Sequence, residues 1–185
     1  GDRITWCSDA TQAYKLVDEN VSSVTRTMVF VKPNVVVVLD RVILDKASRT
    51  VEARFFPDNR DELAKIEVNG TEFRIDRPNA SLYGAFASSV SAVARVADLE
   101  LKPGVVDSEK DPGTGNFGRF PFVGIRAGKA KDHSIVTVLV ARPEGSLGKP
   151  VVEIEKVDAG WTFRADDVKG LLNTSDRIPE VLFSG

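Results

Sequence analysis

Chemistry that needs an imidazole or a thiol can use only His133 or Cys7 in this chain of 185 residues. A Ser-His-Asp triad and a Cys-His pair would both require His133 as the base. These two residues alone cannot make a Cys/His zinc site, and a single cysteine cannot form an internal disulfide. Because no acid partner for His133 can be identified from the spacing, we predict that it is an exposed loop residue. A functional histidine is the alternative, and no catalytic residue, metal site or cofactor is predicted.

Arg26 and Asp40 are charged residues inside two apolar segments. If Lys32–Asn34 is a three-residue loop, the two side chains lie directly opposite each other on neighbouring strands. A cross-strand ion pair would then explain both charges, and we predict this structural pair. The competing interpretation is an arginine that binds a ligand carboxylate in a cleft, since a guanidinium can form two parallel hydrogen bonds to a carboxylate.

Aromatic side chains offer flat faces, some with a polar group, that could stack on sugar rings. In a β-sandwich such residues are more often part of the core, because their large area dominates burial. The aromatic residues considered for a sugar platform are Trp6, Tyr14, Tyr83 and Trp161. The candidate glycan contacts are Trp6, Tyr14, His133 and Trp161.

Two short motifs are better explained by loops and turns. The glycines 113, 115 and 118 match the dinucleotide-binding pattern G-x-G-x-x-G, but Pro121 and aromatic residues follow where a helix must begin. We predict a loop there, within Lys102–Arg119. Four asparagines match the short N-glycosylation pattern, and we interpret them as turn residues: Asn20, Asn69, Asn79 and Asn173.

The elements that position these residues are strands, because the apolar residues recur with a period of two. Alternation predicts strands at Val21–Val31 and Val35–Leu44, joined by a proline turn. The second of these is nearly continuous in β-branched residues, which indicates a central strand covered on both faces. Arg49–Phe56 alternates again, and we predict that it completes a three-stranded antiparallel meander.

Further strands follow along the chain. Asn69-Gly70 predicts a type I′ hairpin turn, since both residues accept positive φ. The other predicted strands are Leu82–Phe86, Val90–Leu101, one at Ile125, Ile135–Val140, Val151–Val157 and Trp161–Phe163. About ten short strands without a long helix predict an all-β antiparallel sandwich and argue against a doubly wound α/β fold. We predict one domain, residues 1–185.

Composition excludes several classes of partner. The 25 Lys and Arg are outnumbered by 27 Asp and Glu, so the chain has no basic surplus for nucleic acid. No charge-free apolar run is long enough to span a membrane, and no signal peptide is recognised. The chain begins with Gly rather than Met, as expected of a domain excised from a larger protein.

The stretch Ser8–Asn59 resembles the C-terminal β-sandwich domain of heparinase II/III-type polysaccharide lyases. In the shared pattern an Arg precedes an apolar strand, a proline turn follows, and the next β-branched strand ends in Asp-Arg. The matching residues are Ala13, Tyr14, Arg26, Phe30, Pro33, Val36, Val37, Val38, Asp40 and Arg41. The resemblance covers roughly the first third of the chain.

This resemblance implies a sandwich paired with an N-terminal helical toroid, with the active site in the cleft between them. It implies β-elimination on acidic polysaccharides such as glycosaminoglycans, in which a Tyr or His base removes the C5 proton and the 4-linked oxygen leaves. In such enzymes the strand after the Asp-Arg strand often carries a His or metal ligands. Here that strand, Glu52–Pro57, has no His, so no catalytic residue is carried over.

The resemblance therefore predicts a non-catalytic domain of a periplasmic or secreted lyase. It would pack on the helical domain of the same protein and line a cleft for acidic polysaccharide. Such docking requires an exposed apolar patch on one sheet face. A stand-alone carbohydrate-binding or surface-interaction module is the alternative, and it would instead show exposed Trp or Tyr. A small hydrolase or lyase that uses His133 is the third hypothesis.

Overall fold

The computed structural model describes residues 2–99, 120–146, 148–174 and 180–184. These residues form fourteen strands and one short helix, α1 (Thr11–Lys15). The strands are β1 (Arg3–Asp9), β2 (Val21–Val31), β3 (Val35–Leu44), β4 (Arg49–Phe55), β5 (Lys65–Asn69), β6 (Glu72–Arg77), β7 (Ala80–Ser88), β8 (Ala92–Leu99), β9 (Phe120–Ala130), β10 (Asp132–Pro143), β11 (Val152–Val157), β12 (Gly160–Ala165), β13 (Val168–Asn173) and β14 (Glu180–Ser184). The predicted all-β fold is confirmed, with more strands than the pattern indicated.

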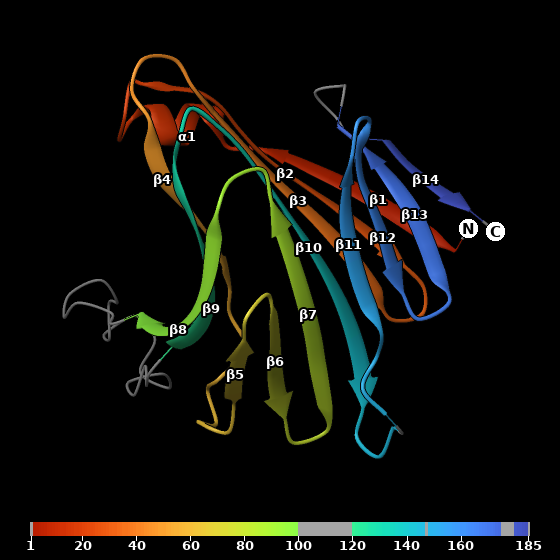
Figure 1. Ribbon diagram of the computed structural model, residues 1–185. Helices are drawn as coiled ribbons and strands as arrows, with labels where there is room; N and C mark the ends of the chain where they lie inside the picture. Colours follow the sequence, from red (N-terminus) through yellow and green to blue (C-terminus); the bar gives the residue numbers. More distant parts are fainter. Residues whose placement is uncertain (1, 100–119, 147, 175–179, 185) are drawn as a thin grey trace.

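A seven-stranded sheet forms the middle layer of the molecule, with strand order β1-β2-β3-β10-β7-β6-β5. The four-stranded sheet β11-β12-β13-β14 packs on one of its faces, and the three-stranded sheet β4-β9-β8 packs on part of the other (Figure 1). Neighbouring strands are antiparallel throughout the described pairs. The sandwich therefore has two hydrophobic cores, one on each side of the middle sheet.

Strands β3 and β10 lie next to each other in the middle sheet and are covered on both faces. In β3, Val37 packs toward the four-stranded sheet and Val38 toward the three-stranded sheet. In β10, Val138 packs toward the four-stranded sheet and Leu139 toward the three-stranded sheet. Side chains alternate across a strand, so a strand with two covered faces needs apolar residues at successive positions. The prediction of a central strand at Val35–Leu44 is confirmed.

The predicted three-stranded meander is wrong in its third strand. β2 pairs with β3 as expected, but β3 pairs on its other side with β10. β4 leaves this sheet and pairs with β9 in the three-stranded sheet. The loop Asp45–Ser48 therefore carries the chain from one layer to another, which strand periodicity alone cannot reveal.

The β5–β6 hairpin is confirmed, but its turn lies one residue later than predicted. Asn69 pairs with Glu72, so Gly70 and Thr71 are the two central residues. Gly70 has φ of +60°, and it alone in this turn has positive φ. Positive φ at the first central position alone indicates a type II′ turn rather than type I′.

The tail after Ala165, whose sequence pattern is weak, continues the four-stranded sheet as β13 and β14. The glycine motif at 113–118 and most of the predicted loop Lys102–Arg119 lie outside the described residues. Across the described residues, no helix has the length and apolar character that a membrane crossing requires.

The β11–β12 turn gives a test of the four-stranded layer. Gly160 has φ of +141°, and a Cβ there would lie 2.1 Å from the carbonyl oxygen of Leu172 on β13. We expect Gly160→Ala to lower the free energy of unfolding by at least about 2 kcal/mol, because strain and a clash with backbone combine. The measurement is urea unfolding followed by tryptophan fluorescence.

Gly145→Ala is the matched control. Gly145 also has positive φ, +79°, but a Cβ would meet no atom within 4 Å. Its cost should be about 1 kcal/mol, from the backbone conformation alone. Equal losses in the two variants would contradict the close approach of β13 to Gly160.

Candidate functional site

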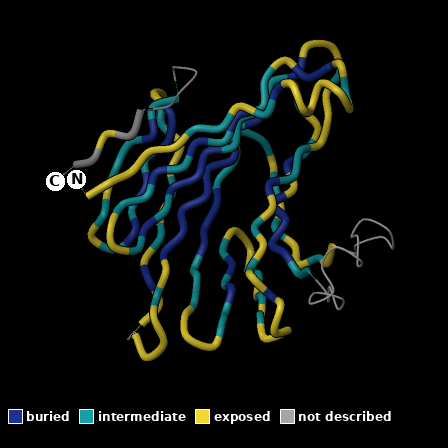
Figure 2. The backbone as a smooth tube through the Cα atoms, turned by 180° about the vertical axis from the view of Figure 1, so that it is seen from behind, coloured by how far each residue is buried: buried dark blue, intermediate teal, exposed yellow. Residues whose placement is uncertain are grey.

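The three-stranded sheet packs on one face of the middle sheet. On this face it leaves β1 and much of β2 uncovered. Val38, Met28 and Trp6 lie side by side across β3, β2 and β1. Their exposure rises toward the edge, from 2% at Val38 to 55% at Trp6. Ile4, two residues before Trp6 on the same face, is 57% exposed. Figure 2 shows β1 largely exposed beside the buried strands of the sheet centre.

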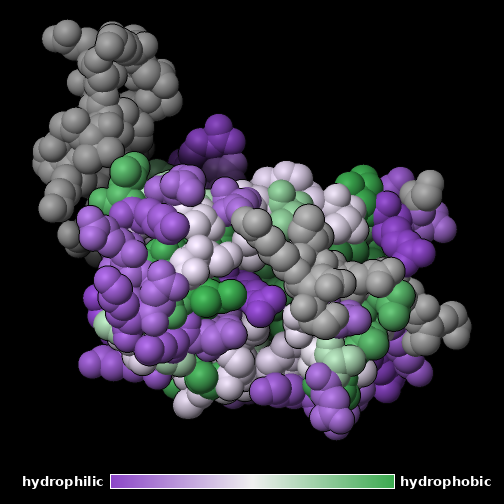
Figure 3. Space-filling model, turned by 90° about the horizontal axis from the view of Figure 1, so that it is seen from above, coloured by the Kyte–Doolittle hydropathy of each residue, from purple (hydrophilic) through white to green (hydrophobic). Residues whose placement is uncertain are grey.

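The exposed large hydrophobic side chains concentrate near the N-terminus. Five of the twelve found among the described residues lie within the first seventeen positions: Ile4, Trp6, Tyr14, Leu16 and Val17. Tyr14 belongs to α1, which packs on β2. We call Ile4, Trp6 and Tyr14 the open face. Seen from above, the surface in Figure 3 is mainly hydrophilic on the left. The hydrophobic residues in this view lie in separate groups.

The predicted ion pair of Arg26 and Asp40 is confirmed and borders the open face. The residues are cross-strand partners, and Arg26 donates two hydrogen bonds, Nε to Oδ1 at 2.6 Å and Nη2 to Oδ2 at 2.9 Å. The Arg26 guanidinium also lies 5.5 Å from the ring centroid of Phe55 on β4. Hydrogen bonding to Asp40 raises the pKa of Arg26, and the nearby Tyr14 adds to this effect. The guanidinium is thus engaged with Asp40 rather than held ready for a ligand carboxylate.

His133 is not an exposed loop residue, so this prediction is wrong. It lies in β10 with 0% exposure. Nε2 is 3.0 Å from the carbonyl oxygen of Arg49 and 3.1 Å from that of Ala130. Carbonyl oxygens only accept, so Nε2 carries the proton and donates to both. Nδ1 is buried and has no partner among the described residues. A side chain enclosed in this way does not contact a glycan on the surface.

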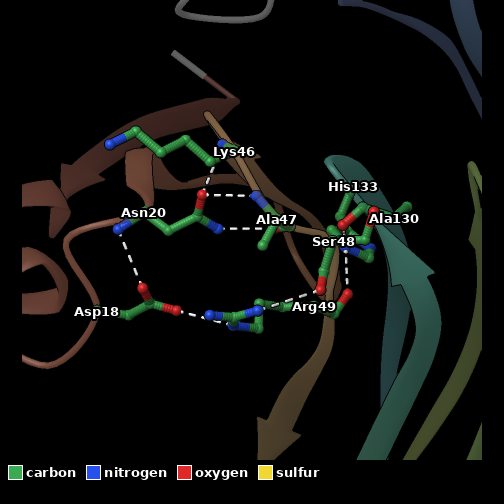
Figure 4. Close-up of polar contacts among 8 residues, drawn as sticks. All are labelled: Asp18, Asn20, Lys46, Ala47, Ser48, Arg49, Ala130 and His133. Atoms are coloured by element: carbon green, nitrogen blue, oxygen red, sulfur yellow. Dashed lines mark hydrogen bonds and ion pairs between the residues drawn. The ribbon is translucent and has the colours of Figure 1, made fainter.

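The loop beside His133 is held by another buried polar side chain, Asn20 (Figure 4). Its Oδ1 accepts from the backbone N–H groups of Lys46 at 2.6 Å and Ala47 at 2.8 Å, and its Nδ2 donates to the Ala47 carbonyl at 2.6 Å. Asp18 pairs with Arg49 at 2.9 Å. These contacts fix the passage from β3 to β4, and Asn20 is a structural residue, as the turn interpretation predicts.

Trp161 is also buried, at 4% exposure, in the core between the middle and four-stranded sheets. It therefore leaves the set of glycan contacts, as His133 does. Tyr83 is half-buried in β7. Trp6 and Tyr14, each 55% exposed, are the predicted aromatic candidates that a ligand can reach. The sequence could not separate the two tryptophans, because each stands in a strand-like segment.

A groove of about 550 Å³ on the four-stranded sheet was not anticipated from the sequence. Its charged lining includes two acids and two bases: Glu153, Glu155, Arg164 and Lys169. Arg164 and Glu153 pair at 3.5 Å, so opposite charges partly neutralise each other there. Among the described residues no group of three or more His, Cys, Asp or Glu side chains could hold a metal ion.

The role of His133 can be tested by removing its donor while keeping a ring. We expect His133→Phe to reduce the free energy of unfolding by about 1 to 3 kcal/mol, because the two carbonyl oxygens lose a buried donor. His133→Gln retains an N–H donor and should lose less. Urea unfolding of both variants gives the comparison. A histidine without structural importance would leave both variants as stable as the parent.

A double-mutant cycle tests the Arg26–Asp40 pair. Arg26→Gln, Asp40→Asn and the double variant should show a coupling free energy of about 1 kcal/mol, because the pair is bidentate but partly exposed. The four unfolding curves are measured at one salt concentration. A coupling close to zero would show that the two charges act independently.

Comparisons with known proteins bear on the whole fold. No protein-family model matches the chain, and no curated protein matches it. Among solved structures, a heparinase III gene product superposes with a TM-score of 0.65 at 12% identity, covering 100% of this chain and 26% of that chain. Heparan sulfate lyase HepC from Pedobacter heparinus gives 0.62 at 10%, with the same coverage. The chain thus spans about a quarter of the proteins it matches and, as its N-terminal motifs predict, it resembles a domain of heparinase III.

Proposed function

We propose that the chain is a non-catalytic β-sandwich domain of a heparinase II/III-like polysaccharide lyase. It packs on a helical domain of the same protein and lines a cleft for acidic polysaccharide. One observation carries this proposal: the likeness to heparinase III covers 100% of this chain but 26% of that chain. A fold that makes up a minor part of a larger enzyme is expected to work with the remaining parts.

The open face supports the docking role. Ile4 and Trp6 are more than half exposed on the side of the middle sheet that the three-stranded sheet leaves uncovered. Apolar side chains gathered on a sheet face favour a protein partner, because burying them removes apolar area from water. Tryptophan is also among the residues that contribute most to interface affinity.

The environment of His133 supports a non-catalytic role. Elimination at a uronate needs a base that reaches the C5 proton, and a base must have this geometry before its pKa matters. His133 is fully buried, and its protonated nitrogen is directed at two backbone carbonyl oxygens. His133 therefore lacks the access that this base requires. We expect the isolated chain to produce no unsaturated uronate.

A stand-alone carbohydrate-binding module is the second candidate. It is favoured by the equal 55% exposure of Trp6 and Tyr14, whose rings could stack on sugars. The two candidates make different use of Trp6: in the first it is covered by a protein domain, and in the second it contacts the glycan directly. We further propose a periplasmic or secreted location, by analogy with such lyases.

The experiment begins with the reading frame upstream of Gly1, where we expect a helical region. That region is produced separately, and its association with the 185-residue chain is measured by isothermal titration calorimetry. Trp6→Ala should weaken association about tenfold or more, because a large apolar side chain at the interface is lost.

Leu63→Ala serves as the control, since Leu63 is likewise 55% exposed but belongs to the segment between β4 and β5. It should leave the affinity unchanged. An upstream frame without a helical region would refute the docking proposal. If Trp6→Ala instead abolished binding of a neutral oligosaccharide, the stand-alone module would be supported.

A further inference from the structure

The outer face of the three-stranded sheet carries three arginines, one on each strand. Arg54 on β4 and Arg95 on β8 are both cross-strand partners of Gly124, and Arg126 follows two residues later on β9. The residues on either side of Arg126, Ile125 and Ala127, are buried in the core, so Arg126 extends outward. We call Arg54, Arg95 and Arg126 the arginine face.

One carboxylate lies at the centre of the arginine face. Glu52 accepts from Arg54 Nε at 2.7 Å and from Arg95 Nε at 2.8 Å. Its side chain is only 12% exposed and lies over Gly124, where a Cβ would be 3.0 Å from the Glu52 Oε1. Burial raises the pKa of Glu52, but the hydrogen bonds and charges of the two arginines outweigh it and leave this pKa below its ordinary value. Glu52 is therefore charged at neutral pH.

Among the described residues, the arginine face carries more positive than negative charge. Two of its guanidinium groups bind the single carboxylate of Glu52, and Arg126 is exposed and forms no ion pair among the described residues. Each guanidinium has five N–H donors, so binding one carboxylate leaves donors on Arg54 and Arg95 for a second anion. The Arg54 guanidinium lies 4.9 Å from the ring centroid of Phe122, which limits the positions it can take.

We propose that the arginine face binds an acidic polysaccharide through its carboxylate or sulfate groups. Planar guanidinium groups bind both anions with paired hydrogen bonds, and the glycine in the middle strand keeps the face flat. This inference rests on the proposed function for its ligand class, but it uses a different surface. The arginine face points away from the middle sheet, whereas Ile4 and Trp6 of the open face lie on β1 of the middle sheet itself.

The test measures the affinity of the 185-residue chain for three probes: a heparin decasaccharide, an oligoguluronate and a neutral maltooligosaccharide. Arg126→Gln should weaken binding of the acidic probes about fivefold, and it should lower the slope of log affinity against log salt by about one, as expected when one cation–anion contact is lost. Binding of heparin alone would identify sulfate as the recognised group, and binding of both acidic probes would identify the carboxylate.

Glu52→Gln supplies a change in the opposite direction. It removes the central negative charge while keeping a hydrogen-bond acceptor, so the acidic probes should bind several-fold more tightly. A purely structural cluster would not show this gain. Thermal unfolding of each variant accompanies the titrations. Because Arg126 is exposed and unpaired in the described structure, its variant keeps the proposal testable if the Glu52 variant unfolds.

Arg164→Gln is the matched control. Arg164 lies on the four-stranded sheet with 43% side-chain exposure, against 46% for Arg95, and its replacement changes the net charge equally. Unchanged affinity in the Arg126 and Glu52 variants, an equal loss in the Arg164 variant, or no binding of either acidic probe would overturn the inference. Those results would leave the docking proposal intact, since association through Trp6 is measured separately.

Discussion

The fold depends on the need to cover β3 and β10 on both faces. These neighbouring strands present apolar side chains to both sides of the middle sheet, with Val37 and Val138 on one side and Val38 and Leu139 on the other. Burial of one such side chain contributes about 1.5 to 3 kcal/mol, so neither face can be left in water. Two covering layers are therefore required, and the chain must leave the middle sheet on both sides to supply them.

The buried polar groups serve this layered arrangement. After β3, the loop Asp45–Ser48 crosses from the middle sheet to the three-stranded sheet, and Asn20 satisfies its backbone groups. His133 then connects the β9–β10 turn with the start of β4 through the carbonyl oxygens of Ala130 and Arg49. Buried polar groups are costly unless they are paired, so these side chains also specify the crossing. The sole histidine thus has an architectural explanation that requires no catalysis.

Features that depend on neighbouring residues could be predicted from the sequence. The bounds of β2 and β3 and the pairing of Arg26 with Asp40 follow from alternation around a three-residue loop. Features that depend on distant segments could not. The sequence separation between His133 and Arg49 conceals their contact, and β4 alternates in the same way whether it pairs with β3 or β9. Trp6 is exposed and Trp161 is buried because another sheet covers the side of the strand on which Trp161 lies and none covers that of Trp6. This difference also depends on distant segments.

Because both cores are occupied by packing, the surfaces left for function lie outside the two cores. The open face is uncovered because the three-stranded sheet is narrower than the middle sheet. The exposed side chains that define the open face are large and mainly apolar. The arginine face is the outer side of that same narrow sheet, where Glu52 orders two of three guanidinium groups. An apolar surface favours a protein partner, and a flat cationic surface favours a polyanion. The proposed docking surface and the proposed glycan surface thus lie on different sheets, so neither proposal requires the other surface.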